Sequence, residues 1–166
     1  YADWGNWLPI MHAYEARKAA YFGTPAVNLI AALNVSLGQI LKEGMEARFA
    51  RHARLSKACK AGIAALGLGQ VPVSDEVAAV TMTAPRYPNG VVGPEFLAKV
   101  GAAGVTLAGG LHPVNKGEYF RIGHMGAVSP GDILATLGAI ESGLAACGYR
   151  FEHGAGVAAA MAVLAG

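Results

Sequence analysis

The sequence predicts a two-layer α+β domain in which short strands pack against helices on one face. Three observations support this fold class. Apolar residues recur at helical spacing in several long stretches, the strand-like stretches are short, and the expected order of elements is α, α, β, α, β, β, α. No internal repeat, GxGxxG pattern or P-loop pattern occurs, so the sequence does not indicate a Rossmann or P-loop nucleotide-binding fold.

Composition places the chain among packed globular proteins. Of its 166 residues, 54% are hydrophobic and 14% are charged, which is enough apolar material for one domain core. The formal net charge of +2, without a basic run, argues against nucleic-acid binding. No CxxC or HxxxH spacing occurs, so the sequence predicts no metal site.

The two cysteines, Cys59 and Cys147, fall in helical patterns and are interpreted as reduced core residues. Reduced thiols indicate an intracellular compartment. The cytoplasm is our first expectation, and peroxisomal and mitochondrial locations stay open. The alanine-rich and valine-rich tail, Gly154–Gly166, is too short to span a bilayer as a helix.

Residues 1–20 form an apolar entry segment. The chain starts at Tyr1 without a methionine or a signal-peptide pattern, and we interpret it as a piece of a longer polypeptide. Gly5 and Pro9 should interrupt any long helix here. We expect the segment to pack against a part of the protein outside this sequence, or, alternatively, to lie as a short amphipathic arm on the same domain. Its apolar residues are Trp4, Trp7, Leu8, Ile10 and Met11.

Two long helices follow. The first is predicted to begin with Thr24 as its N-cap and Pro25 in its first position, and to end at Gly44. The second runs through Leu66 and ends at the glycines that follow; His52 within it is interpreted as a residue at the edge of the core. One face of the first helix has the spacing of a buried face: Ala26, Leu29, Ile30, Leu33, Leu37, Ile40 and Leu41.

The start of the first helix has two interpretations. A helix N-terminus has partial positive charge, and the hydroxyls of Tyr21 and Thr24 lie nearby in the sequence, so an anion could bind there. Alternatively, Thr24 simply caps the helix and Tyr21 packs.

The second half alternates strands and helices. The last main helix is predicted to begin at a capping box in which Ser129 is the cap and Asp132 completes the box, and to end at Gly148. The elements before it are a strand over Val77–Ala84, a turn over Pro88–Gly90, a helix over Pro94–Ala103, and strands over Val105–Ala108 and Glu118–His124.

Arg121 stands in an otherwise apolar strand, Tyr-Phe-Arg-Ile-Gly. A guanidinium stays charged, so burial requires an anionic partner, and its forked donors suit a carboxylate. That carboxylate could belong to a ligand or, as a structural ion pair, to the protein. Gly109 and Gly110, upstream, permit positive φ or close approach of a ligand, although a plain turn is the alternative.

Three motifs together resemble the C-terminal part of the class V aminotransferases, in particular alanine–glyoxylate and serine–pyruvate (serine–glyoxylate) aminotransferases. They are Tyr21-Phe-Gly-Thr-Pro25, Gly109-Gly-Leu111 and Arg121-Ile-Gly-His-Met-Gly126. The resemblance covers roughly residues 1–148. It implies the small C-terminal domain of a fold-type I pyridoxal-phosphate transferase over residues 25–148. Residues 1–24 would then be a segment from the large domain that makes dimer and cofactor contacts, and residues 149–166 a C-terminal extension.

The resemblance also implies residue roles. Arg121 would bind the α-carboxylate of the substrate, and Gly110 would lie beside the substrate. Tyr21 and Thr24 would reach the phosphate of pyridoxal 5'-phosphate in the other subunit of a homodimer. The lysine that forms a Schiff base with the cofactor is expected upstream, because none of the six lysines here fits that role. The chain would therefore contain half of an active site and be inactive alone.

The implied activity is transfer of an amino group from alanine or serine to glyoxylate or pyruvate. A desulfurase or lyase of the same superfamily is one alternative. A desulfurase, however, needs a thiol on a mobile loop, and both cysteines fall in helices. A non-catalytic assembly domain is the alternative from a different functional class.

Overall fold

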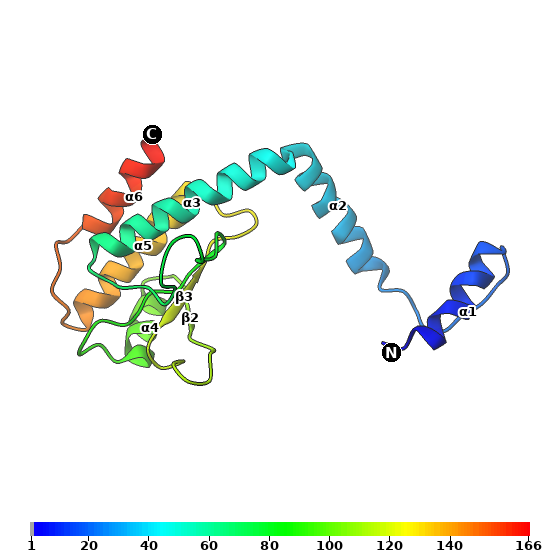
Figure 1. Cartoon of the computed structure of the whole chain (residues 1–166), viewed down its shortest axis with the longest axis horizontal. Helices are drawn as coiled ribbons and strands as arrows, with labels where there is room; N and C mark the ends of the chain where they lie inside the picture. The colour runs from blue at the N-terminus through cyan, green and yellow to red at the C-terminus, as the bar shows by residue number, and fades with distance from the viewer. Residues whose placement is uncertain (1) are drawn as a thin grey trace. The chain divides into compact units, whose positions relative to one another are not determined.

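The computed structural model describes residues 2–166, which form two compact units. The first extends to Met45, and the second comprises Glu46–Gly166 (Figure 1). Six helices and three strands are assigned among these residues. The order is α1 (Trp4–Glu15), α2 (Val27–Glu43), α3 (Met45–Ala65), β1 (Met82–Thr83), α4 (Gly93–Ala102), β2 (Ala108–Gly109), β3 (Phe120–Gly123), α5 (Pro130–Ala146) and α6 (Ala155–Ala165).

In the first unit, α1 runs through Pro9, which corrects the expectation that this proline and Gly5 interrupt a helix. Asp3 caps the helix, since its Oδ1 accepts the Gly5 amide at 2.8 Å. Pro9 has no amide to donate to the Gly5 carbonyl one turn earlier, and the helix continues beyond it. The rings of Trp7 and Phe22 pack edge to face at 4.8 Å, which stabilises the helix against the chain that follows it.

The helix α2 begins at Val27, so the prediction that Thr24 is its N-cap is wrong. The Val27 amide bonds to the Pro25 carbonyl at 2.9 Å, and this tight turn delays the helix. The N-cap is Ala26, and no side chain caps the first turn. The helix ends at Gly44, as predicted, where φ is 85°.

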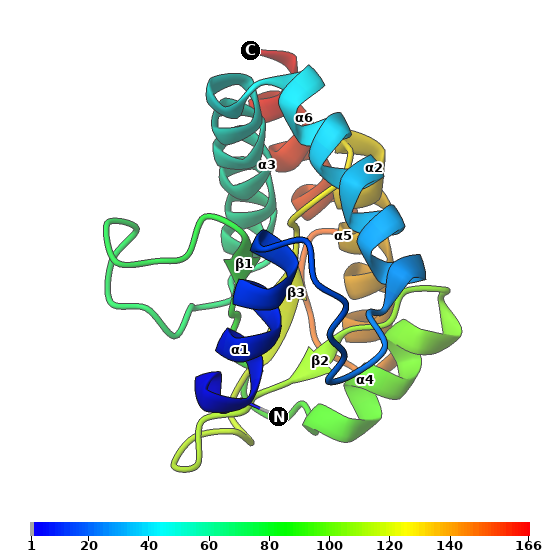
Figure 2. The ribbon, with the colours of Figure 1, turned by 90° about the vertical axis from the view of Figure 1, so that its right-hand side faces the viewer.

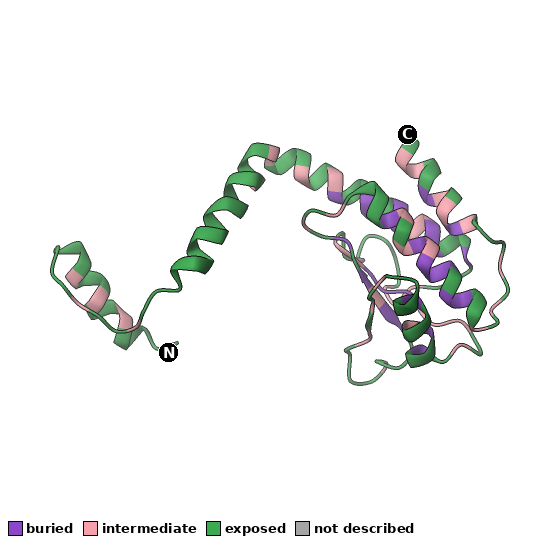
Figure 3. Ribbon diagram, turned by 180° about the vertical axis from the view of Figure 1, so that it is seen from behind, coloured by how far each residue is buried: buried purple, intermediate pink, exposed green. Residues whose placement is uncertain are grey.

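The apolar face of α2 is not buried by the residues that the structure describes, contrary to the prediction. Figure 3 shows the helix exposed along almost its whole length. Leu29 is 72% exposed and Leu41 is 77% exposed. The predicted helix is present, but the spacing of its apolar residues does not identify the surface that would cover its apolar face.

In the second unit, three short strands form an antiparallel sheet in the order β1-β3-β2. The pairing sets Thr83 opposite Ile122 and Ala108 opposite Arg121. The strands lie next to α3, α4 and α5 (Figure 2). This arrangement of a sheet and a helical layer confirms the predicted α+β class.

The strands are shorter than predicted. β1 covers two residues of the predicted Val77–Ala84, and β2 covers Ala108–Gly109 where Val105–Ala108 was expected. Pairing is limited by β3, which offers four residues, although an isolated bridge joins Arg86 to Tyr119 beyond it. The turn at Pro88–Gly90 is confirmed, with the Val91 amide bonded to the Pro88 carbonyl.

The core of the second unit lies between the sheet and its helices. Phe120 and Ile122, which alternate along β3, are both buried in it. The rings of Phe96, on α4, and Phe120 lie 4.9 Å apart. The capping box of Ser129 and Asp132 at the start of α5 is present as predicted.

The C-terminal segment adds a helix to this core. Ala160, on α6, is fully buried in the cluster. A side chain at Gly62, on α3, would collide with the Gly156 carbonyl at 2.8 Å, so α3 and α6 approach closely there. No helix among residues 2–166 is long and apolar enough to cross a membrane.

Candidate functional site

The candidate site lies on the face of β3 that points away from the core. Because side chains alternate along a strand, Tyr119, Arg121 and Gly123 project opposite to Phe120 and Ile122. Arg121 is partly buried. Its partner across the sheet in β2 is the small residue Ala108, so the guanidinium has room on this face.

Arg121 is anchored by a backbone carbonyl. Its Nε donates a hydrogen bond to the Gly109 carbonyl at 2.8 Å. Among residues 2–166, no carboxylate forms an ion pair with Arg121; the nearby Glu118 pairs with Arg86 instead, at 2.8 Å. The alternative of a structural ion pair is therefore not found within the described chain.

This anchor determines which donors remain. The Nε–H is occupied by the carbonyl, so within the described chain the two terminal nitrogens of the guanidinium are the donors left for another acceptor. Two parallel hydrogen bonds from these nitrogens match the two oxygens of a carboxylate. The arrangement at Arg121 is therefore suited to binding a carboxylate.

Gly110 lies beside this arginine for a steric reason. A Cβ there would lie 2.5 Å from the Lys116 carbonyl and 2.6 Å from the ring of Tyr119. Its amide donates to the Tyr119 carbonyl at 3.0 Å. Neither Gly109 nor Gly110 has a positive φ, so close approach, here by protein atoms, explains the glycine at position 110.

Tyr119 is a residue of this site that the sequence did not predict. Its hydroxyl oxygen accepts the amides of Leu111 at 3.0 Å and His112 at 3.2 Å. These two donors lower the pKa of the Tyr119 phenol from its ordinary value, because they stabilise the phenolate, and the nearby Arg121 charge adds to the effect. Its position two residues before the arginine, on the same face of a strand, was the available signal.

Tyr21 and Thr24 come together in the first unit. Their hydroxyl oxygens lie 2.5 Å apart, and both residues are exposed. They precede α2, whose first turn has no side-chain cap. A pair of hydroxyls beside an uncapped helix N-terminus is the kind of arrangement to which anions bind.

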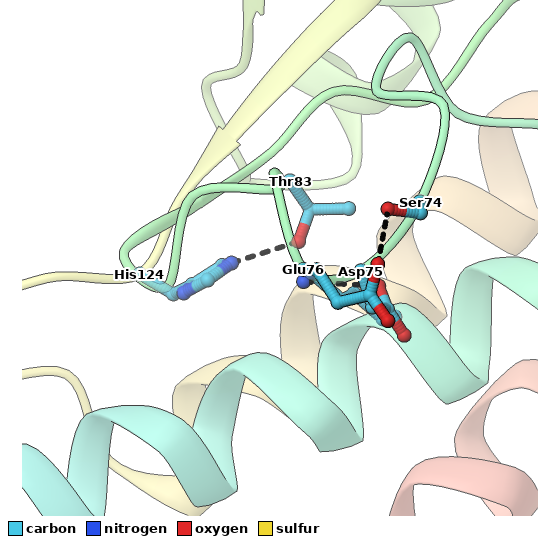
Figure 4. Close-up of polar contacts among 6 residues, drawn as sticks. Ser74, Asp75, Glu76, Thr83 and His124 are labelled. Atoms are coloured by element: carbon cyan, nitrogen blue, oxygen red, sulfur yellow. Dashed lines mark hydrogen bonds and ion pairs between the residues drawn. The ribbon is translucent and has the colours of Figure 1, made fainter.

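A buried polar pair lies on the other side of the sheet (Figure 4). His124 is fully buried, and its Nε2 lies 2.8 Å from the Thr83 hydroxyl. Burial lowers the pKa of His124, which favours the neutral form of its ring. Burial also raises the pKa of the Cys59 thiol to about 11, which makes that thiol a structural residue rather than a nucleophile.

The comparisons with known proteins find aminotransferases among the similar chains. No family model matches the sequence. The chain is 40% identical over 165 residues to a pyridoxamine–pyruvate transaminase of Mesorhizobium japonicum, which covers 98% of this chain and 40% of that protein. It is 34% identical over 164 residues to a serine–glyoxylate aminotransferase of Arabidopsis thaliana, covering 98% of this chain and 39% of the relative. The chain is a homologue of the class V aminotransferases.

One further relative has a different name. A soluble hydrogenase small subunit of Synechococcus is 43% identical over 152 residues, covering 90% of this chain and 39% of that protein. In all three comparisons the chain spans about two fifths of the relative's length.

Solved aminotransferase structures have the same fold over this part. A ureidoglycine–glyoxylate aminotransferase from Bacillus subtilis matches with a TM-score of 0.85 at 28% identity, covering 96% of this chain and 41% of that one. A pyridoxamine–pyruvate aminotransferase from Mesorhizobium loti matches with a TM-score of 0.83 at 37% identity, covering 90% and 38%. The predicted fold-type I aminotransferase architecture is thereby confirmed.

Proposed function

We propose that this chain supplies the carboxylate-binding portion of a pyridoxal-phosphate-dependent aminotransferase that acts on small amino acids and 2-oxo acids. The observation that supports it most is the Arg121 guanidinium, which is fixed by the Gly109 carbonyl at 2.8 Å and paired with no protein carboxylate among the described residues. Every amino acid and 2-oxo acid has the carboxylate that this fork recognises.

Arg121 would act by orientation. Two parallel hydrogen bonds to the carboxylate fix both the position and the direction of the substrate, so that its α-carbon is presented at a defined place. Gly110 keeps the chain beside Arg121 free of a side chain, because Tyr119 and the Lys116 carbonyl already occupy the space.

Pyridoxal 5'-phosphate, when bound, would supply the electron sink and the amino-group carrier. Tyr21 and Thr24 are proposed to bind its phosphate, since their paired hydroxyls precede a helix N-terminus that no side chain caps. In a homodimer, this phosphate would belong to the partner subunit's cofactor.

The lysine that forms the Schiff base would come from a large domain outside this chain. Of the lysines here, Lys60 has a side chain only 13% exposed, and it is paired with Asp75 at 3.2 Å, on a helix that covers the core face of the sheet. Residues 1–166 alone should therefore show no transamination.

The names of the relatives narrow the substrates. They include glyoxylate and pyruvate as amino acceptors, and serine and alanine among the donors. We propose amino transfer from a small donor such as alanine or serine to glyoxylate or pyruvate. A non-catalytic assembly role would leave the Arg121 fork without this use, whereas a lyase of the same superfamily would bind the carboxylate of its amino-acid substrate in the same way and differ in the reaction that follows.

The test uses the complete aminotransferase polypeptide with cofactor bound. Arg121→Lys removes the two-pronged contact but keeps the charge. The KM for the amino donor should therefore rise by a factor that corresponds to a loss of about 2–4 kcal/mol of binding free energy. Cofactor absorbance should be retained. Arg86→Lys is the matched control, because Arg86 pairs with Glu118 at the surface and should leave the KM unchanged. Unaltered kinetics in Arg121→Lys would refute the assignment.

A further inference from the structure

We infer that Tyr119 is a positioning residue of the carboxylate site, which it serves by fixing the loop that orients Arg121. This inference rests on the proposed function. It concerns a residue whose side chain contacts the loop rather than the substrate.

The loop of residues 109–112 is held at two points, by the side chain of Arg121 on β3 and by the side chain of Tyr119 directly before β3. At one point, the Gly109 carbonyl accepts the Arg121 Nε–H at 2.8 Å. At the other, the Tyr119 hydroxyl accepts the amides of Leu111 and His112 at 3.0 and 3.2 Å. The two anchoring residues are two positions apart in extended chain, so their side chains project to the same face.

The ring of Tyr119 completes this support. It lies where a side chain at Gly110 would be, with the Cε1 atom 2.6 Å from the ideal Cβ position. The Gly110 amide also bonds to the Tyr119 carbonyl at 3.0 Å. Tyr119 therefore contacts three successive residues of the loop, directly after the carbonyl that orients the guanidinium.

The hydroxyl is the part of Tyr119 that no other group replaces. Without it, the Leu111 and His112 amides lose their common acceptor, and both residues are otherwise exposed. Two adjacent glycines then allow the loop to change conformation readily. The Gly109 carbonyl would no longer be fixed, and the Arg121 fork would lose its defined direction.

The experiment compares Tyr119→Phe with wild type in the complete, cofactor-loaded polypeptide. The substitution keeps the ring that packs on Gly110 and removes only the hydroxyl. We expect the KM for the amino donor to rise about tenfold while kcat and cofactor absorbance change little. Tyr87→Phe is the matched control: it removes a phenol hydroxyl from a ring that packs on Phe96 and Phe120 in the same unit, and its KM should not change.

A double mutant distinguishes positioning from general damage. In an Arg121→Ala background, Tyr119→Phe should have no further effect on the KM, because its influence passes through Arg121. Reaction with an amine that lacks a carboxylate should be equally fast in wild type and Tyr119→Phe. The inference would be overturned by an unchanged KM in Tyr119→Phe or by an additive effect in the double mutant. It would also be overturned if Tyr119→Phe slowed the reaction with the carboxylate-free amine as much as the reaction with the amino donor.

Failure of the proposed function has a separate signature. If Arg121→Ala itself leaves the KM unchanged, the carboxylate role of Arg121 is wrong and the inference about Tyr119 falls with it. If Arg121→Ala raises the KM and Tyr119→Phe does not, only the inference about Tyr119 is overturned.

Discussion

The Glu141 carboxylate accepts the Gly154 amide at 2.6 Å and so joins the middle of α5 to the start of α6. Its second oxygen accepts the amides of Gly156 and Val157 at 3.0 and 3.2 Å. Glu141 is only 8% exposed. A carboxylate placed this way satisfies the open amides of α6 and interacts favourably with the positive end of the helix.

Removing this carboxylate should destabilise the second unit. Glu141→Ala is expected to lower the free energy of unfolding by about 2–4 kcal/mol, because three charge-assisted hydrogen bonds are lost and their amides lose an acceptor. Glu152→Ala removes an exposed carboxylate from the same connection and is the control. Urea denaturation of residues 1–166 followed by circular dichroism measures both. Equal stabilities of the two variants would contradict this interpretation of α6.

Two glycines on α5 should respond oppositely to alanine. At Gly143, a Cβ would lie 2.6 Å from Val100 and 3.2 Å from Phe96, so Gly143→Ala should overpack the contact with α4 and cost about 1–3 kcal/mol. At Gly138 nothing lies within 4 Å, and Gly138→Ala should stabilise by about 0.5–1 kcal/mol through helix propensity. Thermal melts of both variants provide the comparison, and the same sign of change in both would refute it.

Stability should fall in mild acid because of His124. Burial lowers its pKa below the ordinary 6.5, so as the pH falls below that value the unfolded chain takes up a proton that the folded chain resists. The free energy of unfolding is therefore at its full value above 6.5 and decreases as the pH drops toward the folded-state pKa. One such group gives a slope of at most about 1.4 kcal/mol per pH unit.

His124→Gln should remove this slope while keeping a polar group near the Thr83 hydroxyl. Its free energy of unfolding is expected to be lower than wild type near neutral pH, but flatter between pH 6.5 and 5. The exposed His153 supplies the control, since His153→Gln should keep the wild-type slope. Guanidinium titrations at a series of pH values make the measurement. A His124→Gln variant with an unaltered slope would show that another group is responsible.

The helix boundaries set by local chemistry were predictable from the sequence. The box of Ser129 and Asp132 starts α5, and Gly44 and Gly148 adopt positive φ where helices end. These signals depend on residues within one turn of each other. The Thr24 prediction failed at the same scale, because the Val27 amide bonds to the Pro25 carbonyl and moves the start of α2.

Contacts between distant residues were not predictable in the same way. The prediction of a guanidinium in need of a carboxylate located Arg121, but nothing in the sequence indicated that the Gly109 carbonyl would occupy its Nε. The acceptor role of Tyr119 depends on a loop seven and eight residues upstream folding back over the strand. The exposure of α2 has a related cause, since periodicity describes a face and not its partner.

The last prediction concerns cofactor binding through Tyr21 and Thr24 in the complete polypeptide. Their hydroxyl oxygens lie 2.5 Å apart and share one hydrogen bond, so a bound phosphate would replace that contact and accept from both hydroxyls; either Tyr21→Phe or Thr24→Ala should then weaken retention of pyridoxal phosphate by about tenfold. Because Thr24 does not cap α2, Thr24→Ala should leave helix stability nearly unchanged, unlike the loss of about 1 kcal/mol expected of a true cap. Tyr14→Phe removes an exposed phenol hydroxyl from the same unit and is the control.

Cofactor absorbance after desalting, measured above and below the dimer dissociation concentration, tests whether these hydroxyls bind the phosphate and whether they do so across subunits. If monomer and dimer retain the cofactor equally, the phosphate is not held across subunits; if neither substitution releases it, these hydroxyls do not bind it.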